Sequence, residues 1–400
     1  MKKVTVIGIG INADTLTFEA AKAIKSAQVL AGARRVLDLV SDIYKDAPIR
    51  LYPYYLPSEI SGIIAAEDAE RFAVLVSGDV GFYSAAAGLA SALNDCGVNF
   101  IPGVSTVNAF FARLQLPWQD AAFVSAHGRE TDIAGFVRRN RFSFALTGNN
   151  AGELGAKLSQ CGFGAVKIYV GENLGAKQER IYETVAEDLT RKKFPPLTVL
   201  LFQNDEFDDR TPIGLPDGGF LRLDGIPMTK SETRAVVMSK LNLKPTAVCF
   251  DIGAGTGSVT VEMALAAYRG HIYAVERKKE AVCLILKNCA AFHIGNVKAI
   301  NGEAPAAIEG LPAPDAVFIG GGGRKIGHII KTVWNKNPNA RVVITAVSIE
   351  TVQTALAAFK DAAANYEIVQ ISAARANNVR GLHIMQAQNP ITVFCAGGKP

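Results

Sequence analysis

The sequence lacks any stretch of about 20 uninterrupted apolar residues, the length that a membrane-spanning helix needs. It also lacks a CxxC pair: its six cysteines are widely scattered, so we expect small core side chains rather than a zinc site or a disulfide framework. The sequence lacks the extensive clustering of lysine and arginine expected of a nucleic-acid binder, and the net charge is only +5. These absences predict a protein without metal, membrane or nucleic acid, although the small positive excess suits an acidic ligand.

Charged residues make up only 20% of the 400 residues and hydrophobic residues 49%, which is ordinary globular composition and excludes disorder. The first residues, MKKVTVIGIGIN, resemble an export signal only superficially, because the apolar run is short and interrupted by glycine. We therefore expect a first buried strand and a cytoplasmic protein. The length favours two or three domains, and we expect a homo-oligomer of unspecified subunit number.

Short β-rich runs alternate with alanine-rich helical segments over residues 1–203, which predicts an α/β domain with two lobes. Residues 204–226 hold five Asp, four Gly and two Pro without helical or strand periodicity, and we interpret them as a linker. Strands and helices alternate again over residues 227–400, in the order of a Rossmann-like, doubly wound sheet. The predicted boundaries are therefore 1–203, 204–226 and 227–400.

A glycine-rich loop follows the first strand of the second half, in the sequence DIGAGTG. Its glycines, Gly253, Gly255 and Gly257, let the backbone approach a ligand at the start of the next helix. Glu276 ends the following strand about 20 residues later, where a carboxylate accepts the hydroxyls of a ribose. This arrangement resembles class I methyltransferases that use S-adenosylmethionine; a glycine turn that merely packs strand against helix is the alternative.

Further segments narrow the resemblance. GIPMTKSETRAVVMSKL precedes the first strand, INGEAPAAI follows the third and VFIGGGG ends the fourth, as in the decarboxylating T-type domain of the cobalamin pathway. The family more often has Asp where Glu303 stands. Thr229 also begins a possible capping box with Glu232, a structural alternative to a ligand contact. The resemblance implies these cofactor contacts: Thr229; Gly253, Ala254, Gly255, Thr256 and Gly257 around the methionine part; Glu276 at the ribose; Glu303 and Ala304 beside the adenine.

The first half opens with a GxGxxA pattern formed by Gly8, Gly10 and Ala13, and Arg34 and Arg35 follow the second short strand. An NADP-binding Rossmann half is therefore a competing interpretation. The polar stretch NADTL argues against it, because it separates the glycines from the next helix.

The later loops of this half resemble the tetrapyrrole methylases, and specifically their E-type member of the cobalamin pathway. SGD, PGVST, SAHGR, LTGN and GENLG follow one another in the family's order over residues 3–203. The family commonly has Pro where Val80 stands, and often in the first loop at Ile11 or Asn12. The implied fold has two lobes that hold S-adenosylmethionine between them, although Ser-Gly-Asp is also an ordinary turn. Cofactor contacts are expected from Gly78, Asp79, Val80, Ser105 and Thr106, with Gly8 and Gly10 on the substrate side.

An E-type domain joined to a T-type domain implies two methylations of a corrin precursor, at carbons 5 and 15, with loss of the ring C acetate as carbon dioxide (precorrin-6B to precorrin-8X). It also implies two S-adenosylmethionine sites in one chain. His127 and Glu303 are the candidate catalytic residues. The substrate's carboxylates are expected to meet Arg129, Lys230, Arg234, Arg324 and Arg375. Two alternatives stay open: an NADP-dependent oxidoreductase fused to an RNA or protein methyltransferase, and a regulatory module that binds S-adenosylmethionine without turnover.

Overall fold

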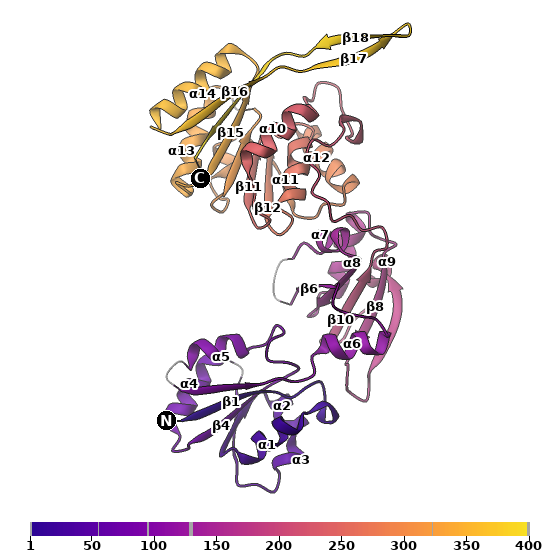
Figure 1. Ribbon diagram of the computed structural model, residues 1–400, viewed down its shortest axis with the longest axis vertical. Helices are drawn as coiled ribbons and strands as arrows, with labels where there is room; N and C mark the ends of the chain where they lie inside the picture. Colours follow the sequence, from indigo (N-terminus) through magenta and orange to yellow (C-terminus); the bar gives the residue numbers. More distant parts are fainter. Residues whose placement is uncertain (1, 55, 94–95, 128–130, 322, 398–400) are drawn as a thin grey trace.

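A computed structural model describes residues 2–54, 56–93, 96–127, 131–321 and 323–397. Three bodies follow one another along the chain and give the molecule a C-shaped outline (Figure 1). We call them lobe 1 (residues 2–101), lobe 2 (residues 106–211) and the C-terminal domain (residues 212–397). All three are α/β, as the sequence predicts.

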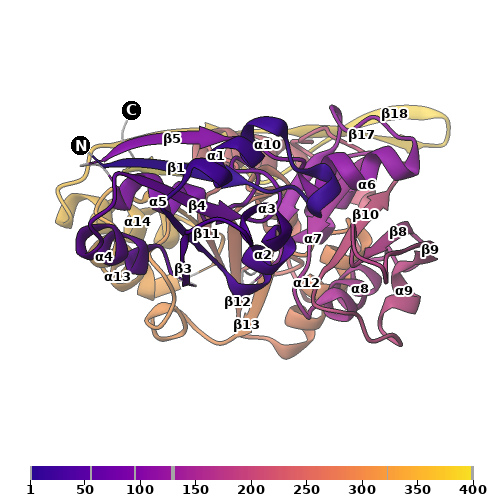
Figure 2. The same ribbon diagram turned by 90° about the horizontal axis from the view of Figure 1, so that it is seen from below.

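Lobe 1 is a parallel sheet with the strand order β3-β2-β4-β1-β5. Successive side chains of a strand point to opposite faces, and both faces here are apolar: Val6 and Val74 pack against α4 and α5, whereas Ile7 and Leu75 pack against α1, α2 and α3. The two helix groups lie apart in Figure 2. The elements are β1 (Lys3–Gly8), η1 (Ala13–Thr15), α1 (Phe18–Ser26), β2 (Val29–Gly32), α2 (Arg34–Leu39), α3 (Ser41–Tyr44), β3 (Arg50–Pro53), α4 (Pro57–Ala66), β4 (Arg71–Val76), α5 (Ala86–Ala92) and β5 (Gly97–Ile101).

Lobe 2 has a mixed sheet with the order β6-β7-β10-β8-β9, in which β6 and β7 are parallel and the other neighbours antiparallel. Phe144 of β7 is fully buried and contacts the rings of Phe110 and Phe111 on α6. The elements are α6 (Thr106–Leu114), β6 (Ala122–Ser125), α7 (Ile133–Arg139), β7 (Phe142–Leu146), α8 (Ala151–Gln160), β8 (Lys167–Glu172), β9 (Arg180–Val185), α9 (Ala186–Leu189) and β10 (Thr198–Gln203).

The C-terminal domain has the sheet order β13-β12-β11-β14-β15-β19-β16, parallel as far as β15, with β19 antiparallel to both of its neighbours. Apolar clusters cover both faces of this sheet, which confirms the Rossmann-like prediction. Its elements are η2 (Asp217–Gly219), α10 (Ser231–Leu241), β11 (Val248–Ile252), α11 (Ser258–Ala266), β12 (His271–Glu276), α12 (Lys279–Ala291), β13 (Val297–Asn301), η3 (Ala306–Ile308), β14 (Ala316–Ile319), η4 (Gly323–Lys325), α13 (Ile326–Lys336), β15 (Arg341–Ala346), α14 (Ile349–Asp361), β16 (Tyr366–Ile371) and β19 (Ile391–Ala396).

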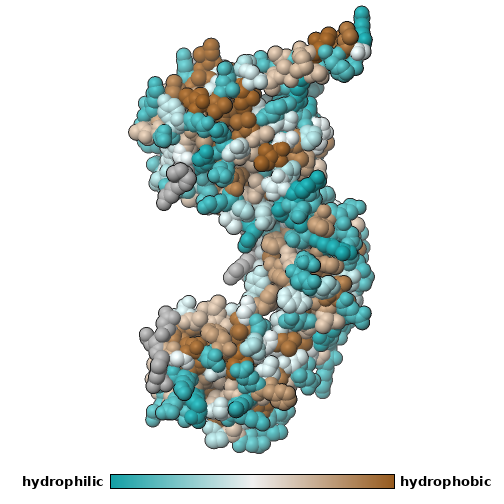
Figure 3. Space-filling view, viewed as in Figure 1, coloured by the Kyte–Doolittle hydropathy of each residue, from teal (hydrophilic) through white to brown (hydrophobic). Residues whose placement is uncertain are grey.

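A hairpin of β17 (Ala374–Val379) and β18 (Leu382–Ala387) projects from this domain (Figure 1). Its side chains are almost all exposed, and apolar atoms are visible along it in Figure 3. The exposed apolar side chains are Val379, Leu382, Ile384 and Met385. The alternating pattern of a half-buried strand is missing here, so the hairpin has no core of its own.

The predicted linker is divided between its two neighbours. Asn204 donates its side-chain amide to the Val137 carbonyl, 2.9 Å away, and the Asp208 amide donates to the Arg138 carbonyl at 2.8 Å, so the first part is bound to lobe 2. Phe220 is only 5% exposed and lies in the core of the C-terminal domain. Residues 204–226 therefore pack on both of their neighbours.

Lobe 2 and the C-terminal domain also contact each other directly. The ring of His293 stacks on Phe163 with the centroids 4.5 Å apart, and its Nδ1 lies 2.7 Å from the Cys161 carbonyl. The Cys161 thiol in turn donates to the carbonyl of Ile294 at 3.4 Å. These contacts fix the orientation of the two bodies.

Candidate active sites

The first cavity lies between lobe 1 and lobe 2 and has a volume of about 430 Å³. Lobe 1 contributes the loops that follow β4 and β5, and lobe 2 contributes the end of β6. Five of the predicted site residues line it: Gly78, Asp79, Ser105, Thr106 and His127. The structure therefore brings together residues that are separated by almost 50 positions in the sequence.

Gly78 is a position where the backbone itself is open to the cavity. Its φ is +69°, which favours glycine, and a Cβ there would find no atom nearer than 4.0 Å. The Asp79 carboxylate is already engaged, because it accepts the amide protons of Gly81 at 2.8 Å and Gly103 at 3.2 Å. Ser105 caps α6 by accepting from the Asn108 amide. Side chains therefore shape these loops, and the backbone of Gly78 stays open to the cavity.

Gly8 and Gly10 lie beneath this cavity and do not line it. A Cβ on Gly8 would come within 2.7 Å of the Gly78 carbonyl oxygen and 2.8 Å of the Gly103 nitrogen. Gly10 and Gly78 exchange two backbone hydrogen bonds, of 3.1 and 2.9 Å. These glycines therefore allow three loops to pack closely. Val80 lines a neighbouring hollow of about 240 Å³.

The first loop does not have the geometry of a dinucleotide site. Asn12 and Thr15 form a reciprocal cap around a 3₁₀ turn, and α1 starts only at Phe18, so no helix begins at the glycines. The Asn12 side chain also donates to the Gly175 carbonyl of lobe 2 at 3.1 Å. This hydrogen bond between the lobes occupies the position where the family often has proline.

Two aromatic residues that the sequence analysis did not select connect the lobes. Phe82 follows the Gly78 loop, and its ring contacts Phe123 of lobe 2 edge to face with the centroids 5.7 Å apart. The Tyr83 hydroxyl donates to the Phe123 carbonyl at 3.1 Å. A usable signal was the sequence GFY, one residue after SGD, because two aromatic side chains at the end of a polar turn need an apolar partner.

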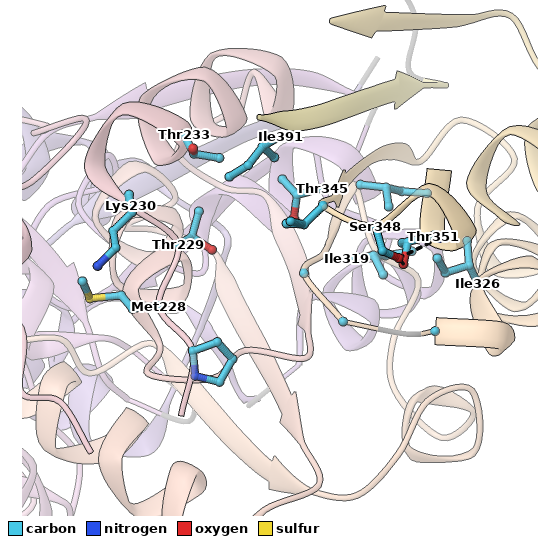
Figure 4. A pocket seen from close by; sticks show the side chains of 16 residues that line it. Met228, Thr229, Lys230, Thr233, Ile319, Ile326, Thr345, Ser348, Thr351 and Ile391 are labelled. Atoms are coloured by element: carbon cyan, nitrogen blue, oxygen red, sulfur yellow. Dashed lines mark hydrogen bonds between the residues drawn. The ribbon is translucent and has the colours of Figure 1, made fainter. Parts of the chain in front are cut away.

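The second cavity, of about 370 Å³, lies in the C-terminal domain, over the carboxyl ends of β14 and β15. Thr229 and Lys230 lie on one side of it, and Ser348 and Thr351 on the opposite side (Figure 4). Gly320 and its neighbours in the loop after β14 complete the lining. Two of the predicted site residues, Thr229 and Lys230, are thus part of this cavity.

The glycine-rich loop supports this cavity from beneath. Gly253, Gly255 and Gly257 have φ values of +74°, +56° and +79°, so each position favours glycine. A Cβ on Gly253 would lie 2.7 Å from the nitrogen of Gly321, and one on Gly255 would lie 2.5 Å from the Pro227 oxygen. Since Gly321 and Pro227 both line the cavity, the loop needs glycine to bring them together.

Two buried polar atoms beside this loop have no hydrogen-bond partner within the protein, namely Oδ1 of Asp251 and Oγ1 of Thr256. Asp251 is fully buried, its other oxygen accepts from the Thr260 hydroxyl, and burial raises its pKa to about 7. Unpaired buried polar atoms next to a glycine loop fit a polar ligand such as S-adenosylmethionine. Asp251 was not among the predicted site residues, although its place at the end of β11 was a usable signal.

Glu276 ends β12 beside the glycine loop, as predicted. Its two carboxylate oxygens accept from the amides of Gly255 and Lys278, both at 3.1 Å, so the side chain is held at the edge of the loop. Ala304 is buried, whereas Glu303 is exposed and accepts from Lys325 at 2.7 Å, a hydrogen bond that lowers the pKa of Glu303. Neither Glu303 nor Ala304 lines a described cavity.

The capping-box alternative for Thr229 is wrong. Helix α10 begins at Ser231, and its N-cap residue is Lys230. Glu232 does not reach back to Thr229: both of its carboxylate oxygens bind the guanidinium of Arg375, at 2.9 and 2.6 Å, and this contact lowers the pKa of Glu232 to about 2.

Arg234 was predicted to bind substrate, and the structure contradicts this. Its side chain is 0% exposed, donates to Glu262 at 2.7 Å and Asp217 at 3.0 Å, and also donates to the carbonyls of Thr229 and Leu215. All of its nitrogen atoms are engaged by the protein, so it holds residues 215–217 onto α10 and α11 instead.

Of the remaining predicted arginines, only the side chain of Arg375 is described. Arg375, at the base of the hairpin, is committed to Glu232 and Asp217 in this structure. Arg129 lies outside the described residues, and the side chain of Arg324 is likewise not described. Among the described residues, no group of three or more His, Cys, Asp or Glu side chains could hold a metal ion. No helix in the described ranges is long and apolar enough to cross a membrane.

Comparisons with known proteins agree with this architecture. The family of tetrapyrrole (corrin/porphyrin) methylases matches residues 3–190, and the precorrin methyltransferase domain matches residues 220–397. The fold and the matched domains define a methyltransferase with one domain of each kind.

One curated relative matches almost from end to end. The precorrin-6Y C(5,15)-methyltransferase [decarboxylating] of Sinorhizobium sp is 30% identical over 396 residues, which are 97% of this chain and 94% of the relative. The chain belongs to the family of decarboxylating precorrin-6Y C5,15-methyltransferases.

Other relatives match only the second half. A probable cobalt-precorrin-6B C(15)-methyltransferase (decarboxylating) of Saccharolobus solfataricus is 40% identical over 192 residues, which are 47% of this chain and 96% of that protein. The crystal structure of the Geobacter metallireducens precorrin-6Y C5,15-methyltransferase shares 32% identity and a TM-score of 0.44, covering 46% of this chain and 97% of that one.

Proposed function

We propose that this methyltransferase converts precorrin-6B to precorrin-8X, with a separate S-adenosylmethionine in each half. The N-terminal domain would methylate carbon 5, and the C-terminal domain would remove the ring C acetate as carbon dioxide and methylate carbon 15. The observation that carries the proposal is the pairing of two separate cavities, each at predicted cofactor loops, with the end-to-end match to a relative named for both methylations.

S-adenosylmethionine, when bound, supplies an activated methyl group. The chain then acts mainly by positioning the reacting groups, which lowers the activation free energy by about 7 to 11 kcal/mol in favourable cases. In the first cavity the exposed backbone of Gly78 would hold the cofactor, and His127 remains a candidate for proton transfer because it lines the same space. In the second cavity Thr229 would lie near the cofactor, and Lys230 would bind a substrate carboxylate.

Glu303 is a weaker candidate for catalysis than His127. Its side chain is 58% exposed, paired with Lys325, and absent from the lining of the second cavity. We therefore keep only its proposed place beside the adenine.

Calorimetry with S-adenosylhomocysteine tests the number of sites. We expect a stoichiometry near two, and no binding of NADP, which the competing oxidoreductase interpretation requires. A stoichiometry of one, or tight NADP binding, would contradict the proposed role of the first half.

A matched pair of cavity-filling variants tests the division of labour. Gly78→Arg fills the first cavity from a position where a Cβ has space but the φ of +69° disfavours it, so folding of this variant is checked by circular dichroism. Gly321→Arg fills the second cavity from a position where the nearest atom to a Cβ is 3.6 Å away. By mass spectrometry of the macrocycle, Gly78→Arg should yield one methyl group gained with carbon dioxide lost. Gly321→Arg should yield one methyl group gained with carbon dioxide retained. Unchanged carbon dioxide release in folded Gly321→Arg would refute the assignment of the second half, and binding without any product would favour the regulatory alternative.

Two further expectations stay predictions. Self-association is supported by the exposed apolar hairpin side chains of β17 and β18, and sedimentation analysis would measure it. A cytoplasmic location and the absence of nucleic acid binding need cell fractionation and a direct binding assay.

A further inference from the structure

We propose that Arg35 is a substrate-recognition residue of the first cavity, where its guanidinium binds an acetate or propionate carboxylate of the tetrapyrrole. This inference rests on the proposed function, because the carboxylate comes from the proposed substrate. It assigns to the N-terminal domain a contact that none of the predicted substrate residues provides there within the described part of the chain.

The topology places Arg35 at the cavity. It lies in the first turn of α2, directly after β2, and β2 is the neighbour of β4 in the parallel sheet, with Gly32 opposite Leu75. The carboxyl ends of β2 and β4 therefore meet at one edge. Arg35 lines the same cavity as Gly78 and His127.

The guanidinium of Arg35 is exposed, and in the described part of the chain it forms neither an ion pair nor a hydrogen bond. The adjacent Arg34 differs in both respects, because its Nε lies 3.5 Å from Asp38 and it does not line the cavity. Asp79 also lines the cavity, but the Gly81 and Gly103 amides already bind its oxygens. Arg35 is thus the one arginine or lysine among the described lining residues, and its donors are available.

A carboxylate suits this position for geometric reasons. The planar guanidinium presents two parallel N–H groups that match the two oxygens of a carboxylate, and this charge-assisted pair is stronger than a neutral hydrogen bond. The proposed substrate carries several such groups around its rim. A cation at the mouth of the cavity would bind one of them while the ring approaches the cofactor loop.

The test uses the full-length protein, precorrin-6B and S-adenosylmethionine, with carbon 5 methylation as the readout. Arg35→Ala should raise the KM for the macrocycle about tenfold, the low end expected for losing one hydrogen bond to a charged group, and leave kcat nearly unchanged. Arg35→Lys keeps the charge and should recover part of the loss. Arg34→Ala is the matched control and should keep the wild-type KM, and carbon dioxide release should be unaffected in all three variants.

Each other outcome has a definite meaning. Equal KM values for Arg35→Ala and Arg34→Ala would overturn the assignment. Weaker binding of S-adenosylhomocysteine to the first site of Arg35→Ala, with an unchanged KM for the macrocycle, would also overturn it, because Arg35 would then serve the cofactor. Absence of carbon 5 methylation in the wild-type protein would instead refute the proposed function, and the inference with it.

Discussion

Replacing Arg234 with methionine should destabilise the C-terminal domain strongly. The change leaves the buried Glu262 without its cation and the buried Asp217 with only Arg375, and it removes the donors from the carbonyls of Thr229 and Leu215. Breaking a buried ion pair by removing one partner typically costs about 3 to 5 kcal/mol, because the remaining charge stays buried. We expect a loss of that size in the free energy of unfolding.

Urea unfolding followed by circular dichroism measures this loss. With a denaturant dependence of about 2 kcal/mol per molar urea for such a domain, 4 kcal/mol corresponds to a midpoint lower by about 2 M. Lys240→Met is the control: it removes a partly exposed ion pair with Glu367, which is worth at most about 1 kcal/mol. Arg234→Lys retains the charge, and its urea midpoint should lie between those of Arg234→Met and Lys240→Met. If Arg234→Met unfolds at the same urea concentration as the control, the structural role assigned to Arg234 is refuted.

Three further results are expected. A fragment of residues 212–400 should fold, whereas residues 227–400 should be less stable by about 3 to 5 kcal/mol, because Phe220 leaves the core; urea unfolding compares them. Burial raises the pKa of Asp251 from 3.8 to about 7, so the folded state keeps a proton that the unfolded chain releases. The free energy of unfolding should therefore fall as the pH rises from about 4 to about 7. Asp251→Asn should make the free energy of unfolding less dependent on pH over that range. Phe82→Ala should weaken cofactor binding at the first site by about three- to tenfold in calorimetry and spare the second, since it loosens the contact between the lobes.

The elements that carry the predicted cofactor loops could be identified from the sequence because their signals are local. A buried strand, a glycine turn and a helix occupy neighbouring residues. Gly253, Gly255 and Gly257 all have a positive φ, which explains why glycine stands at these three positions. The order of strands and helices likewise predicted the Rossmann-like domain.

The arginines could not be assigned in the same way. Arg234 and Arg375 both stood in or near a motif loop, but both bind Asp217, which lies 17 residues from Arg234 and 158 from Arg375. Spacing cannot show whether a guanidinium has been used by the fold. For a related reason, composition described the polar residues of the predicted linker and not the burial of Phe220.

The direct contact between lobe 2 and the C-terminal domain bears on how both halves of the chain would methylate one macrocycle. His293 and Ile294 of the C-terminal domain contact Phe163 and Cys161 of lobe 2, so the second cavity lies in a body that contacts one wall of the first cavity directly. Carbons 5 and 15 lie on opposite sides of a tetrapyrrole. In the proposed reaction these two carbons are methylated in different cavities. The macrocycle must leave one cavity, turn, and enter the other with its opposite edge first.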